Sequence, residues 1–182
     1  MDNGASSYRR FLDGDESAFG ELYELYQDSL IFFLYRYVRN YTVAEDLAAD
    51  SFAVLIAYPR KYNFSVSLKT YLFTIGRNFA LNWLKHNRKF RVVAVDEAEE
   101  IADVEALEES VIADERKRRI SEALDRLNDD YRTVIHLIFF ENMSYEEAGL
   151  IMKKSKKQID NLIYRAKNAL RADLGKECYE IL

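Results

Sequence analysis

The side chains with the clearest chemistry in this 182-residue sequence are hydrogen-bond donors near its C-terminal end. They lie between Ser155 and Arg171 on one face of a predicted helix, whose opposite face is apolar at helical spacing (Ile159, Leu162, Ile163, Ala166 and Leu170). Lysine, arginine and amide groups donate to phosphate oxygens or contact base edges, and a helix of this size fits the major groove of a duplex. We therefore predict a duplex-binding face made of Ser155, Lys156, Lys157, Gln158, Asn161, Tyr164 and Arg165.

Two start signals place this helix in a helix-turn-helix. Ser144 with Glu147, and Ser155 with Gln158, have the spacing of capping boxes, in which both side chains satisfy backbone N–H groups at a helix start. Starts so close together leave room only for a short helix, a tight turn and a second helix. The alternative is an ordinary amphipathic helix hairpin with a solvated basic face.

A second group of donors lies earlier in the chain. The stretch 60–91 contains eight lysines and arginines and no acid, and aromatic residues are interleaved with them. Rings stack on unpaired bases while cations follow the phosphates, so this composition suits single-stranded nucleic acid. The alternative is that Tyr62, Phe64 and Tyr71 simply pack a loop. The charge asymmetry favours nucleic-acid binding.

An acidic segment separates the two basic stretches. Residues 92–115 contain ten aspartates and glutamates and no lysine or arginine, which explains the formal net charge of −5 in a predicted nucleic-acid-binding protein. We interpret this segment as a linker between two modules.

The elements that position these groups are predicted to be helices. Six glycines and one proline are too few for an all-β protein, so the expected fold class is all-α with two helical domains. The predicted helices are 15–39, 42–58 (capping box of Thr42 and Glu45, stop at Pro59), 68–91 (cap Ser67), 120–127, 129–139 (cap Asp129) and the two of the helix-turn-helix. The expected core faces are Phe19, Leu22, Tyr23, Tyr26, Leu30, Phe33, Leu34 and Tyr37 in the first, and Leu68, Leu72, Ile75, Phe79 and Trp83 in the third.

Catalytic chemistry has no support in the sequence. It contains no glycine-rich phosphate loop, no paired Cys or His metal spacing and no nucleophile next to a base, so we expect no enzyme, metal or cofactor. His86 and His136 stand alone on predicted helices, where a histidine is usually structural or superficial. The single Cys178, the lack of an apolar run of membrane-spanning length and the lack of an apolar signal core lead us to expect a cytoplasmic protein without membrane insertion.

In combination, these motifs resemble the bacterial sigma factors of the sigma-70 family, in particular the small extracytoplasmic-function (ECF) group. AEDLAADSFAVL (44–55) is similar to the family's A-E-D-L-x-Q-D-x-F stretch, and SLKTYLFTIGRNFALNWLKHNRK (67–89) is similar to its minus-ten helix. LNDDYRTVIHLIFFENMSYEEAGLIM with KKSKKQIDNLIYRAKNALR resembles its fourth domain. The resemblance implies region 2 at 8–91, an acidic linker at 92–115 and region 4 at 116–175.

The resemblance also implies partners and site residues. Core RNA polymerase and promoter DNA are the expected partners of a chain that is monomeric when free, and an anti-sigma factor is a further candidate. The implied polymerase contacts are Asp46, Leu47, Asp50 and Phe52. The implied minus-ten contacts are Asn63, Phe64, Ser65, Tyr71, Arg77, Asn78, Asn82 and Lys85, and the duplex-binding face described first would meet the minus-thirty-five element.

Three departures from the family pattern accompany the resemblance. Lys153 replaces a glycine common at the helix turn, so a left-handed backbone there carries a steric cost. Ala49 replaces the usual glutamine, and Asp160 puts an acid where a basic residue is common. Two other functions remain open at this point: a free-standing helix-turn-helix regulator and a protein-interaction adaptor.

Overall fold

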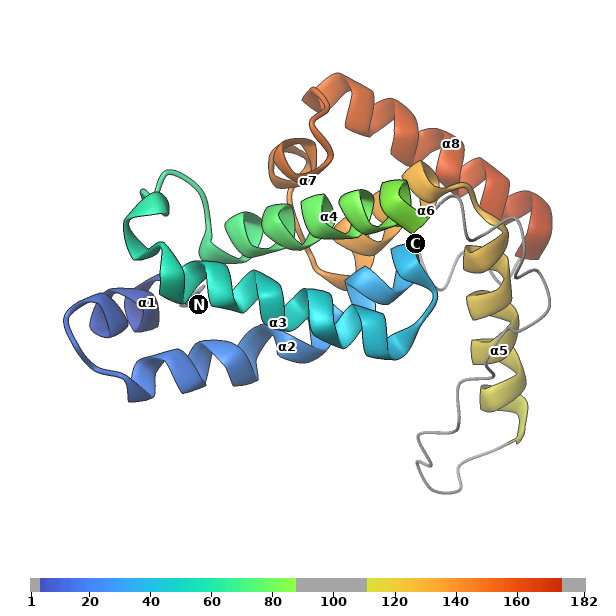
Figure 1. The fold of residues 1–182 in the computed structure, drawn as a ribbon. Coiled ribbons are helices and arrows are strands. Elements are labelled where there is room, and N and C mark those ends of the chain that lie inside the picture. The colour runs from blue at the N-terminus through green and yellow to red at the C-terminus, as the bar shows by residue number, and fades with distance from the viewer. Residues whose placement is uncertain (1–3, 88–110, 175–182) are drawn as a thin grey trace.

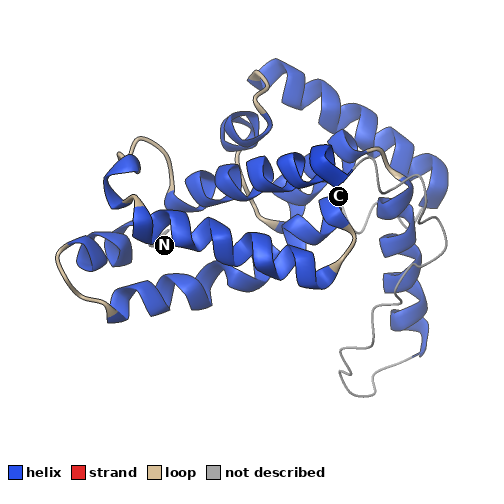
Figure 2. Ribbon diagram, in the orientation of Figure 1, coloured by secondary structure: helices blue, strands red, loops and turns tan. Residues whose placement is uncertain are grey.

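The computed structural model describes residues 4–87 and 111–174, and all regular structure within them is helical (Figures 1 and 2). The expected all-α class is therefore confirmed. Most of the acidic linker lies outside the described residues. The elements are α1 (Ala5–Leu12), α2 (Ser17–Val38), α3 (Tyr41–Ala57), the 3-10 turn η1 (Pro59–Lys61), α4 (Leu68–Asn87), α5 (Val111–Arg126), α6 (Asp129–Ile135), the π-helical turn η2 (His136–Phe140), α7 (Tyr145–Met152) and α8 (Lys156–Leu174).

The N-terminal module is a bundle in which α2 packs against α1, α3 and α4. The expected core stripe of α2 is buried, except that Phe19 is half-buried and Tyr23 is 39% exposed. The Tyr23 ring still packs against the core, with its centroid 4.9 Å from that of Phe52. Apolar residues at helical spacing thus predicted the element and most of its buried face.

The start of α3 differs from the prediction. Its cap is Asn40, whose side-chain oxygen accepts a hydrogen bond from Val43 N at 2.9 Å, and the helix begins at Tyr41. The predicted capping box of Thr42 and Glu45 is therefore wrong, because an asparagine two residues earlier already occupies the cap position. The predicted stop is confirmed: α3 ends at Ala57, directly before Tyr58 and Pro59.

The helix α4 begins at its predicted cap, since Ser67 Oγ accepts from Thr70 N at 3.1 Å. Its buried face is rotated relative to the prediction. Leu68 and Leu72 are buried as expected, but Ile75, Phe79 and Trp83 are only half-buried. The helix is covered from more than one side, by α2, α3 and α7, and its most enclosed positions are Leu68, Thr70, Leu72, Phe73, Gly76 and Ala80.

In the C-terminal module, α6 and α7 pack against α8, and α5 packs against it as well. The cap of α6 is Asn128, which accepts from Tyr131 N at 2.9 Å, and not the predicted Asp129. The buried Arg132 donates to the carbonyls of Leu124, Asp125 and Leu127 and so satisfies the end of α5. Burial lowers the pKa of this guanidinium from its usual value. These three carbonyls and that of Arg36 nevertheless stabilise its charge through their dipoles.

The two modules are packed against each other, with α7 crossing α4 and α6 lying next to α2 (Figure 1). Arg132 also donates to Arg36 O at 2.9 Å, and Thr133 Oγ1 donates to Tyr37 Oη at 2.8 Å. Asp125 forms ion pairs with Arg36 and Arg39. No helix among the described residues is long and apolar enough to cross a membrane.

Candidate nucleic-acid interface

The helix-turn-helix predicted from the two capping boxes is present as α7, a short turn and α8. Ser144 Oγ accepts from Glu147 N at 3.2 Å, and Glu147 Oε2 accepts from Ser144 N at 3.0 Å. Ser155 and Gln158 repeat this exchange at 3.3 Å and 2.8 Å. Both boxes are therefore confirmed, and they fix where each helix starts.

The turn between the helices contains a strained residue and a close backbone contact. Lys153 has φ 56° and ψ 45°, which is the left-handed conformation that carries a steric cost for a residue with a Cβ. Gly149, in α7, has no side chain, and a Cβ added there would lie 2.6 Å from Lys154 O. Lys154 N also donates to Gly149 O at 2.9 Å. Sequence reasoning missed Gly149, because a close approach between two turns of backbone has no local signature.

The predicted duplex-binding face of α8 is exposed throughout: Ser155, Lys156, Lys157, Gln158, Asn161, Tyr164 and Arg165 all face solvent. On the opposite side Ile159, Ile163, Ala166 and Leu170 are buried, and Leu162 is half-buried. Glu146 of α7 pairs with Lys156 and raises the pKa of that ammonium, mainly through their hydrogen bond. Two acids, Glu146 and the exposed Asp160, thus lie beside the donor face.

The loop between η1 and α4 presents two polar side chains on an aromatic base. Asn63 Oδ1 accepts from Ser65 N at 3.1 Å, and both residues are exposed. Phe64 between them has φ 60°, and its ring lies 4.6 Å from that of Tyr62. The Tyr62 ring in turn lies 5.1 Å from that of Tyr71. These contacts hold the loop in one conformation with Asn63 and Ser65 pointing outward.

Tyr8 packs against the rings of Tyr62 and Phe64 in this aromatic cluster. Its hydroxyl donates to Leu55 O at 3.0 Å and to Pro59 O at 3.1 Å, and burial raises the pKa of the phenol to about 12. The ring therefore stays neutral and anchors the end of α3 to η1. Packing of the loop by its rings, the alternative considered from the sequence, describes this part of the structure accurately.

The remaining minus-ten candidates differ in exposure along α4. Asn82 and Lys85 are exposed, whereas Tyr71, Arg77 and Asn78 are half-buried. Arg77 is engaged within the protein: Nε donates to Tyr37 Oη at 3.1 Å and a terminal nitrogen donates to Ile151 O at 3.3 Å.

The four polymerase-binding candidates on α3 divide into two pairs. Asp46 and Asp50 are exposed, while Leu47 and Phe52 belong to the core of the N-terminal module. The Phe52 ring packs against the rings of Phe19 and Tyr23. The exposed acids consequently form a polar edge on a well-supported helix.

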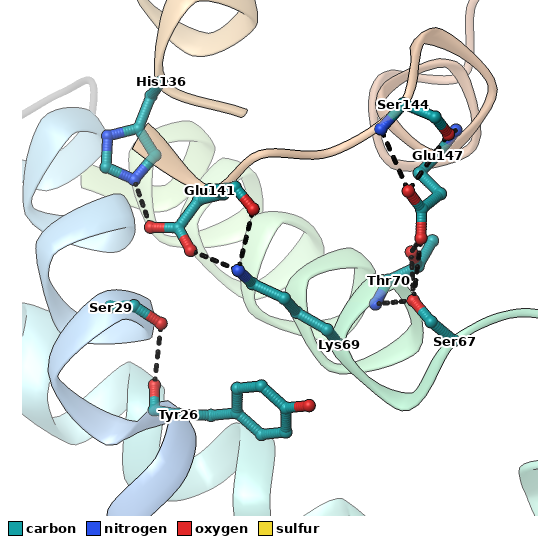
Figure 3. A network of polar contacts seen from close by, with 9 residues as sticks. All are labelled: Tyr26, Ser29, Ser67, Lys69, Thr70, His136, Glu141, Ser144 and Glu147. Atoms are coloured by element: carbon teal, nitrogen blue, oxygen red, sulfur yellow. Dashed lines mark hydrogen bonds and ion pairs between the residues drawn. The ribbon is translucent and has the colours of Figure 1, made fainter. Parts of the chain in front are cut away.

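A further group of polar residues, which the sequence did not single out, joins the two modules (Figure 3). Ser67 and Thr70 at the start of α4 donate to Glu147, and the neighbouring Lys69 pairs with Glu141. The partners are separated by 72 to 80 residues in the chain. No local pattern marks such pairs, because they depend on how the modules dock.

Comparison with protein families gives two matches in chain order. Residues 22–90 match the family described as Sigma-70 region 2, and residues 117–170 match Sigma-70, region 4. Together these segments contain the exposed edge of α3, the loop and α4 on one side, and the helix-turn-helix on the other.

Individual relatives agree with the family matches. The RNA polymerase sigma factor CarQ of Myxococcus xanthus is 30% identical over 167 residues, which cover 92% of this chain and 95% of CarQ. The ECF RNA polymerase sigma factor SigW of Bacillus subtilis is 27% identical over 172 residues, covering 88% and 91%. Among solved structures, the sigma factor RpoE of Bartonella quintana, in complex with the anti-sigma factor NepR, has a TM-score of 0.70 at 28% identity, covering 87% of this chain and 97% of that chain. This chain therefore belongs to the sigma-70 family of bacterial RNA polymerase sigma factors, in its extracytoplasmic-function group.

Proposed function

We propose that this chain is a dissociable promoter-specificity subunit that binds core RNA polymerase and directs transcription initiation. The observation that carries the proposal is the presence, in one chain, of an exposed donor face on a helix-turn-helix and of an aromatic loop and helix α4 within the acid-free stretch 60–91. The first surface suits duplex DNA and the second suits an unpaired strand. A free-standing helix-turn-helix regulator needs only the first.

The exposed donors of α8 would bind the minus-thirty-five duplex. Lys156, Lys157 and Arg165 suit phosphate contacts, while Gln158 and Asn161 carry amides that can pair with base edges in the major groove. Asp160 and Glu146 reduce the net positive charge of this surface. Weak intrinsic duplex binding is the expected consequence, and a polymerase that holds region 4 in place would compensate for it.

The loop and α4 would bind the melted minus-ten strand. A base captured by Asn63, Phe64 and Ser65 would meet polar groups on a loop that its aromatic base already holds in one conformation. Asn82 and Lys85 would follow the strand further along α4. Capturing a base requires only a few kcal/mol of unstacking, which stacking and phosphate contacts can offset, so no bond chemistry is involved.

The exposed acids of α3 would bind core polymerase. Asp46 and Asp50 can pair with basic groups of the partner, and Leu47 and Phe52 would act by holding α3 in place beneath them. The proposal keeps region 2 at 8–91 and region 4 at 116–175 and assigns no catalytic activity to the chain. It places the protein in the cytoplasm, where core polymerase and promoter DNA are, and includes an anti-sigma partner of the kind found with RpoE of Bartonella quintana.

The decisive experiment is run-off transcription from genomic fragments with purified core polymerase of demonstrated activity. We expect promoter-specific transcripts only when the chain is added. The variant Asp50→Asn should require more core polymerase for half-maximal product, while Glu24→Gln, which changes another exposed acid, this one on α2, should not. The proposal fails if no fragment gives a product, and tight operator binding by the chain alone would favour the free-standing regulator.

A further inference from the structure

Helix α1 precedes the residues that match region 2, which begin at residue 22, yet it contacts the loop proposed above to capture a base. It lies at the same end of the N-terminal module as that loop (Figure 1). The buried Tyr8 ring lies 5.6 Å from that of Tyr62 and 6.3 Å from that of Phe64, and its hydroxyl donates to Pro59 O. Because Tyr8 is enclosed, it fixes the position of α1 relative to the loop.

The next residue, Arg9, holds a cation over this loop. Its guanidinium carbon lies 4.8 Å from the centroid of the Phe64 ring, and Arg9 is exposed. A cation on the face of a ring is attracted by the ring's quadrupole, and the contact leaves the N–H groups of the guanidinium able to donate to another partner. Burial raises the pKa of the Tyr62 phenol and the charge of Arg9 opposes that rise, so this charge acts across the aromatic cluster.

The neighbouring Arg10 shows what distinguishes Arg9. Arg10 forms ion pairs with Glu21 and, at 3.5 Å, with Asp15, so its positive charge is matched by carboxylates of its own module. Within residues 4–87 and 111–174 the side chain of Arg9 forms no ion pair and donates no hydrogen bond. Exposed arginines are often simply solvated, but this one is held at a fixed place on the loop where a strand is expected.

Phe64 acts as a support for the loop more than as a surface for stacking. It has φ 60°, a strained conformation for a bulky side chain, and strain of this kind occurs where the surroundings enforce it. Its ring contacts those of Tyr8 and Tyr62 as well as the guanidinium of Arg9. The loop therefore offers the polar neighbours of Phe64 to the edge of a base, and Arg9 adds a cation beside them.

The segments that meet at this loop contain cations and no acids. Residues 4–12 contain no aspartate or glutamate, and neither does the stretch 60–91. The turn η1, to which Tyr8 is hydrogen-bonded, adds the exposed Arg60 and Lys61. A nucleic-acid strand carries a phosphate on every nucleotide, and a guanidinium can bind one through two parallel N–H groups. A base whose edge reaches the loop thus brings a phosphate to a surface without competing carboxylates.

We infer, on the basis of the function proposed above, that Arg9 is a further minus-ten contact, whose guanidinium binds the backbone phosphate next to the base captured by the loop. Tyr8 is a positioning residue for this contact, since it fixes α1 against the loop. Phe64 holds the guanidinium in place before the strand arrives, so less side-chain freedom is lost on binding. The contact itself reads no sequence and strengthens the binding of a strand whose base fits the loop.

The test measures how binding of the melted strand depends on salt. The probe is a fluorescein-labelled single strand with the minus-ten element of a promoter found by run-off transcription, and it is titrated with core polymerase carrying each variant. We expect Arg9→Gln to bind at least about threefold more weakly near 50 mM salt. The slope of log K against log salt concentration should be shallower by about 0.7, the change for one phosphate contact on a single strand. Arg10→Gln, which removes the same charge one residue away, should keep the wild-type slope.

Two further measurements separate a phosphate contact from a purely structural role. Arg9→Lys keeps the charge and should keep the slope, whereas a change that only loosened the loop would weaken binding and leave the slope of Arg9→Gln unaltered. Strands in which one phosphate at a time is replaced by a neutral methylphosphonate should locate the contact. At one position the wild type should lose affinity and Arg9→Gln should lose none, because the partner of that phosphate is already absent.

A wild-type slope in Arg9→Gln, or equal losses in both proteins at every methylphosphonate position, would overturn the inference. The proposed function would remain intact, because the wild-type chain with core polymerase still initiates at the same promoter. If no genomic fragment gives a product with active core polymerase, the proposed function has failed, and the Arg9 contact fails with it.

Discussion

Replacing Gly149 and Gly20 by alanine, one at a time, tests whether the helix-turn-helix depends on a close backbone approach. A Cβ at Gly149 would lie 2.6 Å from Lys154 O, and ordinary contacts begin near 3.4 Å, so the turn or α7 must move. Gly20 lies within α2, and a Cβ there would have no atom within 4 Å. The chemical change is the same, but only one site has an obstacle.

The two effects can be separated by subtraction. Alanine is more favourable than glycine inside a helix by about 0.5–1 kcal/mol, and this gain applies to both variants. Crowding a packed site costs about 1–3 kcal/mol and applies only at Gly149. We therefore expect Gly20→Ala to raise the free energy of unfolding and Gly149→Ala to lie about 1–3 kcal/mol below Gly20→Ala.

Urea denaturation followed by circular dichroism measures both values. In thermal melts the midpoints should differ by about 2–4 °C per kcal/mol for a chain of this size. Gly149→Ala should also weaken duplex binding, since the shift falls between α7 and α8. The reasoning is refuted if the two variants agree within about 0.5 kcal/mol, the usual range for surface substitutions.

Three further predictions concern single positions. Lys153→Gly should raise the free energy of unfolding by about 0.5–1 kcal/mol in urea denaturation. The reason is that the left-handed strain of about 1–2 kcal/mol exceeds the extra freedom of glycine in the unfolded chain. An unchanged or lower free energy of unfolding would mean that the turn is not strained. Burial lowers the pKa of His136 despite its hydrogen bond to Glu141, so near about pH 6 the unfolded chain binds a proton that the folded chain does not. The free energy of unfolding should therefore fall as the pH is lowered from about 7 to about 5.5. An identical dependence of this free energy on pH in His136→Gln would contradict the prediction. Asp160→Asn should tighten binding to duplex DNA a few-fold in fluorescence anisotropy at low salt, with the gain shrinking near about 200 mM salt, whereas a gain that persists would point to a cause other than charge.

The features that the sequence alone determined are local. Both capping boxes of the helix-turn-helix form as predicted, because a serine and an acid or amide three residues apart meet within one turn of helix. The same pattern at Thr42 and Glu45 failed because Asn40, an equally good cap, lies two residues earlier. The exposed face of α8 was predictable for the same local reason: a stripe of apolar residues on one side of a helix leaves the other side to solvent.

The features that only the tertiary structure decided involve residues far apart in the chain. The rotated core face of α4 follows from its position between α2, α3 and α7, and one helix cannot reveal how many neighbours cover it. Gly149 has no room for a Cβ, because Lys154 O lies too close. Glu147 has a capping role, which its spacing from Ser144 indicated, and a contact with the other module, which no spacing indicated. The capping role needs only a residue three positions away. The contact with Thr70 exists because the two modules pack against each other. The free energy of that packing comes from whole surfaces, and a short sequence pattern does not show which surfaces will meet.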